Sequence, residues 1–254
     1  MRLALGLVLA LVFGGSARAA TPFELYEQGK FDAAVAAGLA ANDAAGLAVA
    51  ARATLAAETM RSARCLDCIK RAEDYARRAI RNDPRNADAH VFLAVALGRE
   101  GRLESVFTVL RKGYPTLARH ELDAAIAADP RHAQAWAALG GWNIEIVRKG
   151  GKAMAKMMYG ATPEAGFAAF DRALVLAPGD VGLLYQYALT LSAYDADTYR
   201  AKIADALARS ANGIPQGAYE AFAQTRAREL LAALQKGDRS AYAALVARDQ
   251  GAPD

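Results

Sequence analysis

The sequence predicts an all-α fold that is built from stacked helical pairs. Of its 254 residues 63 are Ala, the residue with the highest helix propensity, and only 8% are aromatic. Asp-Pro and Ala-Pro steps interrupt the helical periodicity at intervals, and no segment has the pattern of a strand. With 54% hydrophobic and 23% charged residues, the composition is that of a globular protein. A disordered, collagen-like, all-β or polytopic membrane protein is therefore not expected.

The first nineteen residues have the order of a secretory signal peptide. Met1-Arg2 precedes an apolar run, residues 3–13, and small residues follow up to Ala17-Arg18-Ala19. The run is shorter than the roughly 18 residues that a spanning helix needs. We expect cleavage after Ala19 and a periplasmic or secreted mature chain, residues 20–254, with no stable membrane span. A retained N-terminal anchor helix is the alternative.

The charge balance gives no argument for a nucleic-acid partner. Without Arg2 and Arg18 the chain has 29 basic and 27 acidic residues, so it is close to neutral. Secretion makes nucleic acid a still poorer candidate, and none is expected as a partner.

The only cysteines, Cys65 and Cys68, form one C-x-x-C motif just before a helical run at residues 69–81. In an oxidising compartment this pair can close a local disulfide, and a structural disulfide or a free pair is the favoured interpretation. A redox role would need a neighbouring strand, and a zinc site would need two further ligands at suitable spacing. Redox and metal roles remain the alternatives; no metal or other cofactor is expected.

Three segments share one pattern of small residues, a proline and a new helix. A helix that reaches Asp-Pro ends because proline cannot continue it, and the next helix begins two or three residues later. One such helical pair cannot bury its own apolar face, so neighbouring pairs must stack. The segments are Ala72, Ala79 and Asp83-Pro84; Ala118, Ala125 and Asp129-Pro130; and Ala173 and Ala177-Pro178.

These residues resemble the tetratricopeptide repeat (TPR) family. Trp136, Leu139 and Gly140 match the first-helix pattern of that family, as do His90, Leu93 and Ala94. The N-terminal unit, with Tyr26, Gly29, Phe31, Ala34 and Ala41, fits the same pattern, whereas Gly166 replaces the first small residue of the third clear unit. The resemblance implies a TPR-like α-solenoid, a right-handed superhelix of stacked hairpins.

The spacing of the units predicts insertions within them. The equivalent residues Ala41, Ala79, Ala125 and Ala173 are 38, 46 and 48 residues apart, against about 34 in the family. Because the Asp-Pro type turns are short, the extra residues must lie between the two helices of a unit, at about 101–116 and 149–163. Insertions at equivalent junctions would project from one edge of the solenoid, which is a candidate contact surface.

Residues 83–190 also resemble the helical-repeat domain of the regulator of microtubule dynamics family. The resemblance rests on Leu139-Gly140-Gly141-Trp142, on Tyr159-Gly160-Ala161-Thr162-Pro163-Glu164, and on Phe170, Ala173, Leu174 and Pro178. It implies that the insertions are a family property. Because the chain begins with a signal peptide of bacterial type, tubulin is not expected as its partner. The resemblance therefore implies the fold and not the partner.

Helical periodicity continues to the C-terminus at residues 181–194, 198–211, 218–234 and 240–247. Breaks fall at glycines and prolines such as Gly213-Ile214-Pro215. We therefore expect about six helical hairpins in a single domain, residues 20–254.

The implied fold places candidate binding residues on the concave face of the first helices. Their mixed polar and apolar character suits a peptide or an acyl-type small molecule better than a phosphate. Arg99 and Glu145 have an alternative interpretation as solvated helix charges. The groove candidates in the register of the fold are Asp88, Val91, Arg99, Gln134, Glu145, Tyr185 and Leu189.

A second candidate surface is the basic segment at residues 148–159. It combines four cations with three methionines, which suits anionic lipid or an acidic partner. Its alternative interpretation is a solvated connection whose methionines pack on the neighbouring pair. The cations are Arg148, Lys149, Lys152 and Lys156.

The sequence contains no group of residues with a pattern typical of a catalytic site. His90 is expected to pack in the core, and no histidine has a spacing that would pair it with a nucleophile or a metal. The chain is thus predicted not to be an enzyme but an interaction module, which holds a protein or peptide partner of the cell envelope in its groove. The alternative is a carrier whose superhelix encloses a lipid or another apolar small molecule.

Overall fold

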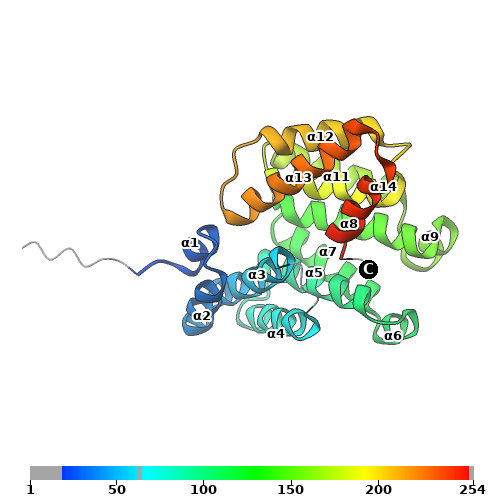
Figure 1. Cartoon of the computed structure of the whole chain (residues 1–254). Helices are drawn as coiled ribbons and strands as arrows, with labels where there is room; N and C mark the ends of the chain where they lie inside the picture. The colour runs from blue at the N-terminus through cyan, green and yellow to red at the C-terminus, as the bar shows by residue number, and fades with distance from the viewer. Residues whose placement is uncertain (1–18, 62–64, 252–254) are drawn as a thin grey trace, which may run out of the picture.

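The computed structural model describes residues 19–61 and 65–251 (Figure 1). All of the regular structure in this part is helical, and no strand occurs there, which confirms the predicted all-α class. The signal-peptide prediction falls mainly on residues 1–18, which lie outside the described residues. The helices are α1 (Pro22–Glu27), α2 (Phe31–Ala41), α3 (Ala44–Met60), α4 (Leu66–Asn82), α5 (Ala87–Leu103), α6 (Val106–Lys112), α7 (Tyr114–Ala128), α8 (Ala133–Gly150), α9 (Lys152–Tyr159), α10 (Pro163–Leu176), α11 (Val181–Asp195), α12 (Arg200–Asn212), α13 (Ala218–Lys236) and α14 (Arg239–Asp249).

Twelve of these helices pack as six successive pairs within the described residues. The pairs are α1 with α2, α3 with α4, α5 with α7, α8 with α10, α11 with α12, and α13 with α14. Every second helix also contacts the first helix of the next pair, and the first helices from α3 to α13 contact one another in turn. Because each second helix returns the chain, the first helices from α3 to α13 run in the same direction. Their C-terminal ends therefore share one rim of the molecule, and their N-terminal ends share the other.

Three of the turns between pairs, those with Pro84, Pro130 and Pro178, begin the next helix in one recurring way. Two residues after each of these three prolines a side chain accepts a hydrogen bond from a backbone N–H of the first helical turn, which satisfies a donor that has no partner in the helix. Asn86 accepts from the N–H of Ala89, and Asp180 accepts from that of Leu183. His132 occupies the same position through its Nδ1, which accepts from Ala135.

The predicted insertions contain two further helices, α6 and α9. Sequence patterning places extra residues at both junctions but does not predict that they are helical. Each helix packs mainly on one neighbour, α6 on α7 and α9 on α8. In Figure 1 both project at the same side of the molecule.

Small residues occupy the contacts between neighbouring helices. Ala72, Ala79, Ala125 and Ala173 are fully buried. Gly140 of α8 lies against the ring of Phe170 of α10, where an added Cβ would come within 2.6 Å of the ring. The high Ala content thus allows close helix approach as well as helix formation.

The two ends of the helical array contact each other. Helices α1 and α3 both contact α13, so the first pairs meet the last one (Figure 1). The contact is close, because a Cβ at Gly29 would lie 2.8 Å from the Cβ of Ala218. The inner face of the first helices is thereby bounded on both sides. Within the described residues no helix is long and apolar enough to cross a bilayer.

Candidate functional site

The inner face of the first helices encloses a groove with a cavity of about 430 Å³. Residues from α1, α3, α5, α7, α8, α11 and α13 line it, so the site depends on the whole array rather than on one pair. Its middle is apolar, with Leu55, Val91, Phe92, Val95 and Ile144 on the wall. The volume lies in the range of cavities that hold small ligands or a few peptide residues.

Acidic side chains gather at one rim of the groove, where α11 and α13 begin and the short helix α1 ends. Glu27, Asp180 and Glu220 all line this part of the groove. Burial raises the pKa of the Glu220 carboxyl above its ordinary value, and the nearby carboxylates of Asp180 and Glu27 raise it further. The three carboxyl groups are therefore close enough to influence one another, and they make this the acidic rim of the groove.

Arg52 of α3 stands beside this acidic rim among aromatic rings. Its guanidinium lies 4.5 Å from the ring centre of Tyr26, 5.5 Å from that of Phe23 and 5.7 Å from that of Phe92. Such cation–π contacts hold a charged side chain against an apolar wall. Sequence reasoning missed Arg52, although it is the only cation in the seventeen residues of α3.

Basic side chains gather at the opposite rim, where α5 and α8 end. Glu145 is surrounded there by Arg148 at 2.9 Å, Arg102 at 3.6 Å and Lys149 at 3.6 Å. Burial would raise the pKa of the Glu145 carboxyl, but the hydrogen bonds from Arg148 and the charge of Arg102 outweigh burial and lower it. One carboxylate thus faces three cations, so this group keeps an excess of positive charge.

Arg99 adds a fourth cation to the same rim but has its own partner. Its Nη1 lies 2.6 Å from Oε2 of Glu58 and donates a hydrogen bond to the carbonyl of Leu55. The side chains of Arg99 and Glu58 are 22% and 14% exposed, so this pair fixes α5 against α3. Arg99 therefore forms part of the groove wall, and its charge is paired with that of Glu58.

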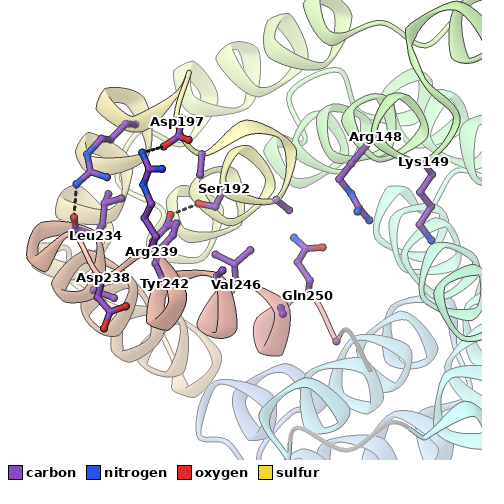
Figure 2. Close-up of a pocket in the computed structure, with 18 of the residues that line it drawn as sticks. Arg148, Lys149, Ser192, Asp197, Leu234, Asp238, Arg239, Tyr242, Val246 and Gln250 are labelled. Carbon is purple, nitrogen blue, oxygen red and sulfur yellow. Dashed lines mark hydrogen bonds and ion pairs between the residues drawn. The ribbon is translucent and has the colours of Figure 1, made fainter. Parts of the chain in front are cut away.

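A second cavity of about 590 Å³ continues from the basic rim toward α14. Arg102, Arg148 and Lys149 line both cavities, together with Gln250. Figure 2 shows Arg148 and Lys149 across the cavity from Tyr242, Val246 and Gln250. The cationic group is therefore accessible from two sides, with an apolar surface next to it.

The structure brings together some of the predicted groove residues and not others. Val91, Arg99, Gln134 and Glu145 line the groove. Asp88 does not line it; it instead accepts a hydrogen bond from Nε2 of His132 at 3.1 Å.

The prediction of Tyr185 and Leu189 as groove residues is wrong. They are 5% and 3% exposed, in the core that α11 forms with the C-terminal helices, and the hydroxyl of Tyr185 donates to Asp249. The groove face of α11 is presented by Leu183, Gln186 and Thr190 instead. The register of the TPR family predicts that this side of α11 faces the groove, but helices of the last two pairs pack against it.

The basic segment divides between two places. Arg148 and Lys149 belong to the groove rim, whereas Lys152 and Lys156 lie on α9 and line neither cavity. Two of the α9 methionines, Met154 and Met157, are 52% and 80% exposed. The alternative interpretation, a solvated connection whose methionines pack on the neighbouring pair, is therefore wrong about these methionines, which are largely exposed.

The remaining sequence candidates form local structural contacts. Cys65 and Cys68 are joined in a disulfide at the start of α4. His90 is buried, as expected for a packing residue, and forms an ion pair with Glu121. Within residues 19–61 and 65–251 no group of three or more His, Cys, Asp or Glu has an arrangement that could hold a metal ion.

Comparison with known proteins places the chain among helical proteins. A family model described as Regulator of microtubule dynamics protein 1-3 matches residues 39–235, which include every helix from α3 to α12 and all but the last residue of α13. No curated protein matches the chain. The matched range contains both insertions and most of the groove wall.

Proposed function

Because the chain belongs to the Regulator of microtubule dynamics protein 1-3 family, whose members are helical, we propose that it is a non-catalytic binding module. The groove is its ligand site, and the partner is a peptide segment of another protein. In this proposal the six helical pairs act as a TPR-like solenoid, which holds its ligand on the concave face. No cofactor is needed for such a role.

The opposite charges at the two rims of the groove carry this proposal. Glu27, Asp180 and Glu220 supply negative charge at one rim, and Arg102, Arg148 and Lys149 supply positive charge at the other, with apolar wall between them. A peptide with apolar side chains between a basic and an acidic residue complements all three regions at once. Complementary charge also fixes the direction in which such a peptide binds.

Photo-cross-linking from inside the groove tests this proposal. Gly98 and Gly141 line the groove, and a side chain added at either position would meet no neighbouring atom within 4 Å. Benzoylphenylalanine placed at either position in the full-length protein should cross-link a protein partner in cells. The matched control is Gly179, which also has open space around it but lies outside the groove.

Only one pattern of cross-links supports the peptide proposal. A discrete protein adduct from positions 98 and 141, with none from position 179, is expected. Adducts of equal yield from all three positions would show that contact does not involve the groove. Reversal of charge by Arg148→Glu should weaken the adduct, because it removes a cation from the basic rim.

The second candidate function is a carrier of a lipid or another apolar small molecule. It is favoured by the apolar middle of the groove and by the contact between α1 and α13, which bounds the cavity. The same cross-linking experiment separates the two functions. A carrier would give an intact protein whose mass is increased by a small molecule, and no protein adduct.

The proposed location is the periplasm or the medium, after cleavage behind Ala19. The disulfide between Cys65 and Cys68 fits an oxidising compartment. Mass spectrometry of the mature protein from the envelope fraction tests both points. A mass that begins at Ala20 and lacks two hydrogens supports the proposal, whereas a reduced chain that still begins at Met1 contradicts it.

A further inference from the structure

The exposed apolar side chains of the described residues are concentrated on α6 and α9. Ten large hydrophobic side chains are exposed, and six of them lie on these two short helices. Isolated exposed apolar residues are normal on a protein surface, but a concentration of this kind marks a contact surface. On α6 they are Val106, Phe107 and Leu110, and on α9 they are Met154, Met157 and Met158.

On each helix these side chains form one face. Val106 and Phe107 lie four and three positions before Leu110, and Met154 lies three and four positions before Met157 and Met158, so the members of each set are neighbours on the helix surface. Phe107 is 76% exposed and Met157 is 80% exposed. Both faces are largely exposed, and each helix is attached to the body mainly through one neighbour.

The charge on the two helices has a single sign. Arg111 and Lys112 close α6, and Lys152 and Lys156 belong to α9, but neither helix contains Asp or Glu. Within the described residues Lys112 is the only one of these four cations that forms an ion pair, with Glu104, which lies outside α6 at 2.7 Å. A second copy of the chain would bring these cations against one another, so self-association through this surface is disfavoured.

We propose that α6 and α9 together dock the protein onto an anionic lipid bilayer. Exposed apolar side chains enter the boundary between headgroups and acyl chains, while the lysines and Arg111 contact anionic headgroups, as in other interfacial helices. Both helices project at the same side of the molecule (Figure 1), so one surface can be contacted by both. This docking is independent of the ligand that occupies the groove.

Binding to vesicles tests the proposal with the full-length protein. Vesicles of phosphatidylcholine that contain phosphatidylglycerol should bind it, with affinity that falls as salt is added, and vesicles of phosphatidylcholine alone should bind it less. The double variant Phe107→Asp with Met157→Asp should bind at least about tenfold more weakly, because it loses apolar insertion and adds repulsion from anionic headgroups.

Matched controls separate docking from general hydrophobicity. Val175 and Ile214 are 71% and 78% exposed but lie on α10 and before α13. The double variant Val175→Asp with Ile214→Asp should bind as the parent does. Circular dichroism checks that both double variants are folded, and the N-terminal apolar run is common to all of the proteins compared.

Hydrogen exchange locates the contact directly. Amide exchange in peptides that cover α6 and α9 should slow when phosphatidylglycerol vesicles are added. Unchanged exchange there, equal binding by the two double variants, or a dimer in solution that only Phe107→Asp with Met157→Asp dissociates would each overturn the proposal.

Discussion

His90 is a buried side chain whose surroundings favour its charged form. Its Nδ1 lies 2.6 Å from Oε2 of Glu121, and its Nε2 lies 3.0 Å from the carbonyl oxygen of Pro84. A carboxylate and a carbonyl both accept hydrogen bonds, so an imidazolium that donates from both nitrogens satisfies both. The hydrogen bond with Glu121 raises the His90 pKa above 6.5, although burial acts in the opposite direction.

The raised His90 pKa predicts a contribution to stability that is lost at high pH. A group whose pKa is higher in the folded state stabilises fully below its unfolded value and loses this contribution as pH rises through the folded value. The variant His90→Gln should therefore be less stable than the parent by about 1–2 kcal/mol at about pH 6, and the difference should shrink in alkali. Urea unfolding across this range measures it. A difference that is constant with pH would contradict the assignment.

Glu100 presents the reverse case, a buried carboxyl that favours its neutral form. It is 1% exposed, it accepts a hydrogen bond from the hydroxyl of Tyr114, and burial together with Glu73 raises its pKa to about 7. The unfolded chain releases this proton near 4.5, so the stability of the folded protein falls as pH rises from there toward about 7.

Replacement of Glu100 by glutamine, its neutral isostere, should remove this loss of stability at higher pH. The variant Glu100→Gln keeps an acceptor for Tyr114 and carries no charge, so at about pH 8 it should be more stable than the parent by at least ~1 kcal/mol. Below about pH 5 the two should be similar. Thermal unfolding at both pH values checks this, and a lower melting temperature for the variant at the higher pH would refute it.

At the residue scale the sequence predicts which side chains line the groove only where the repeat register of the first helices is clear. Val91, Gln134 and Glu145 line the groove from α5 and α8, whose repeat pattern is regular. The prediction fails for Tyr185, because helices from the last two pairs cover that side of α11. Arg52 was missed because its helix carries no repeat signature, and only long-range packing brings it to the groove.

Helix packing between α8 and α10 depends on the absence of a side chain at Gly140. A Cβ there would lie 2.6 Å from the ring of Phe170, which is fully buried. Gly141, the next residue of α8, faces the groove, and a Cβ there would meet nothing within 4 Å. Adjacent glycines of one helix therefore have opposite packing environments.

This difference predicts opposite effects of one substitution. Gly140→Ala should destabilise the protein by about 1–3 kcal/mol, because overpacking forces the helices apart. Gly141→Ala should stabilise it by about 0.5–1 kcal/mol, because alanine has less freedom to lose in a helix. Chemical denaturation of both variants measures the difference. Equal effects would show that α8 and α10 do not pack as described.

At the element scale the paired helices could be predicted and the inserted ones could not. Proline and capping residues mark the ends of α4, α5, α7 and α8 in the sequence itself, so their existence follows from local chemistry. The insertions were predicted from spacing alone. Helices α6 and α9 have only 7 and 8 residues and leave their apolar faces exposed, so neither length nor an ordinary burial pattern reveals them.

At the scale of the whole molecule, the contact between the first and last pairs turns an array of helices into a bounded groove. No repeat pattern predicts this contact, because it depends on the cumulative rotation from one pair to the next. It places the acidic rim, from α1, α11 and α13, around a shared apolar middle. The charge pattern of the site therefore depends on the contact between the first and last pairs rather than on any single repeat.

Titration with anilinonaphthalene sulfonate tests most directly whether the groove is a ligand site. This probe has an apolar body and one anionic group, which match the apolar wall and the cations Arg102, Arg148 and Lys149. The parent protein should bind it saturably at one dominant site. Gly98→Trp, which fills open space in the groove, should weaken binding by about tenfold or more, whereas Gly179→Trp outside the groove should not. Equal binding by the two tryptophan variants would contradict the central claim that the groove holds the ligand.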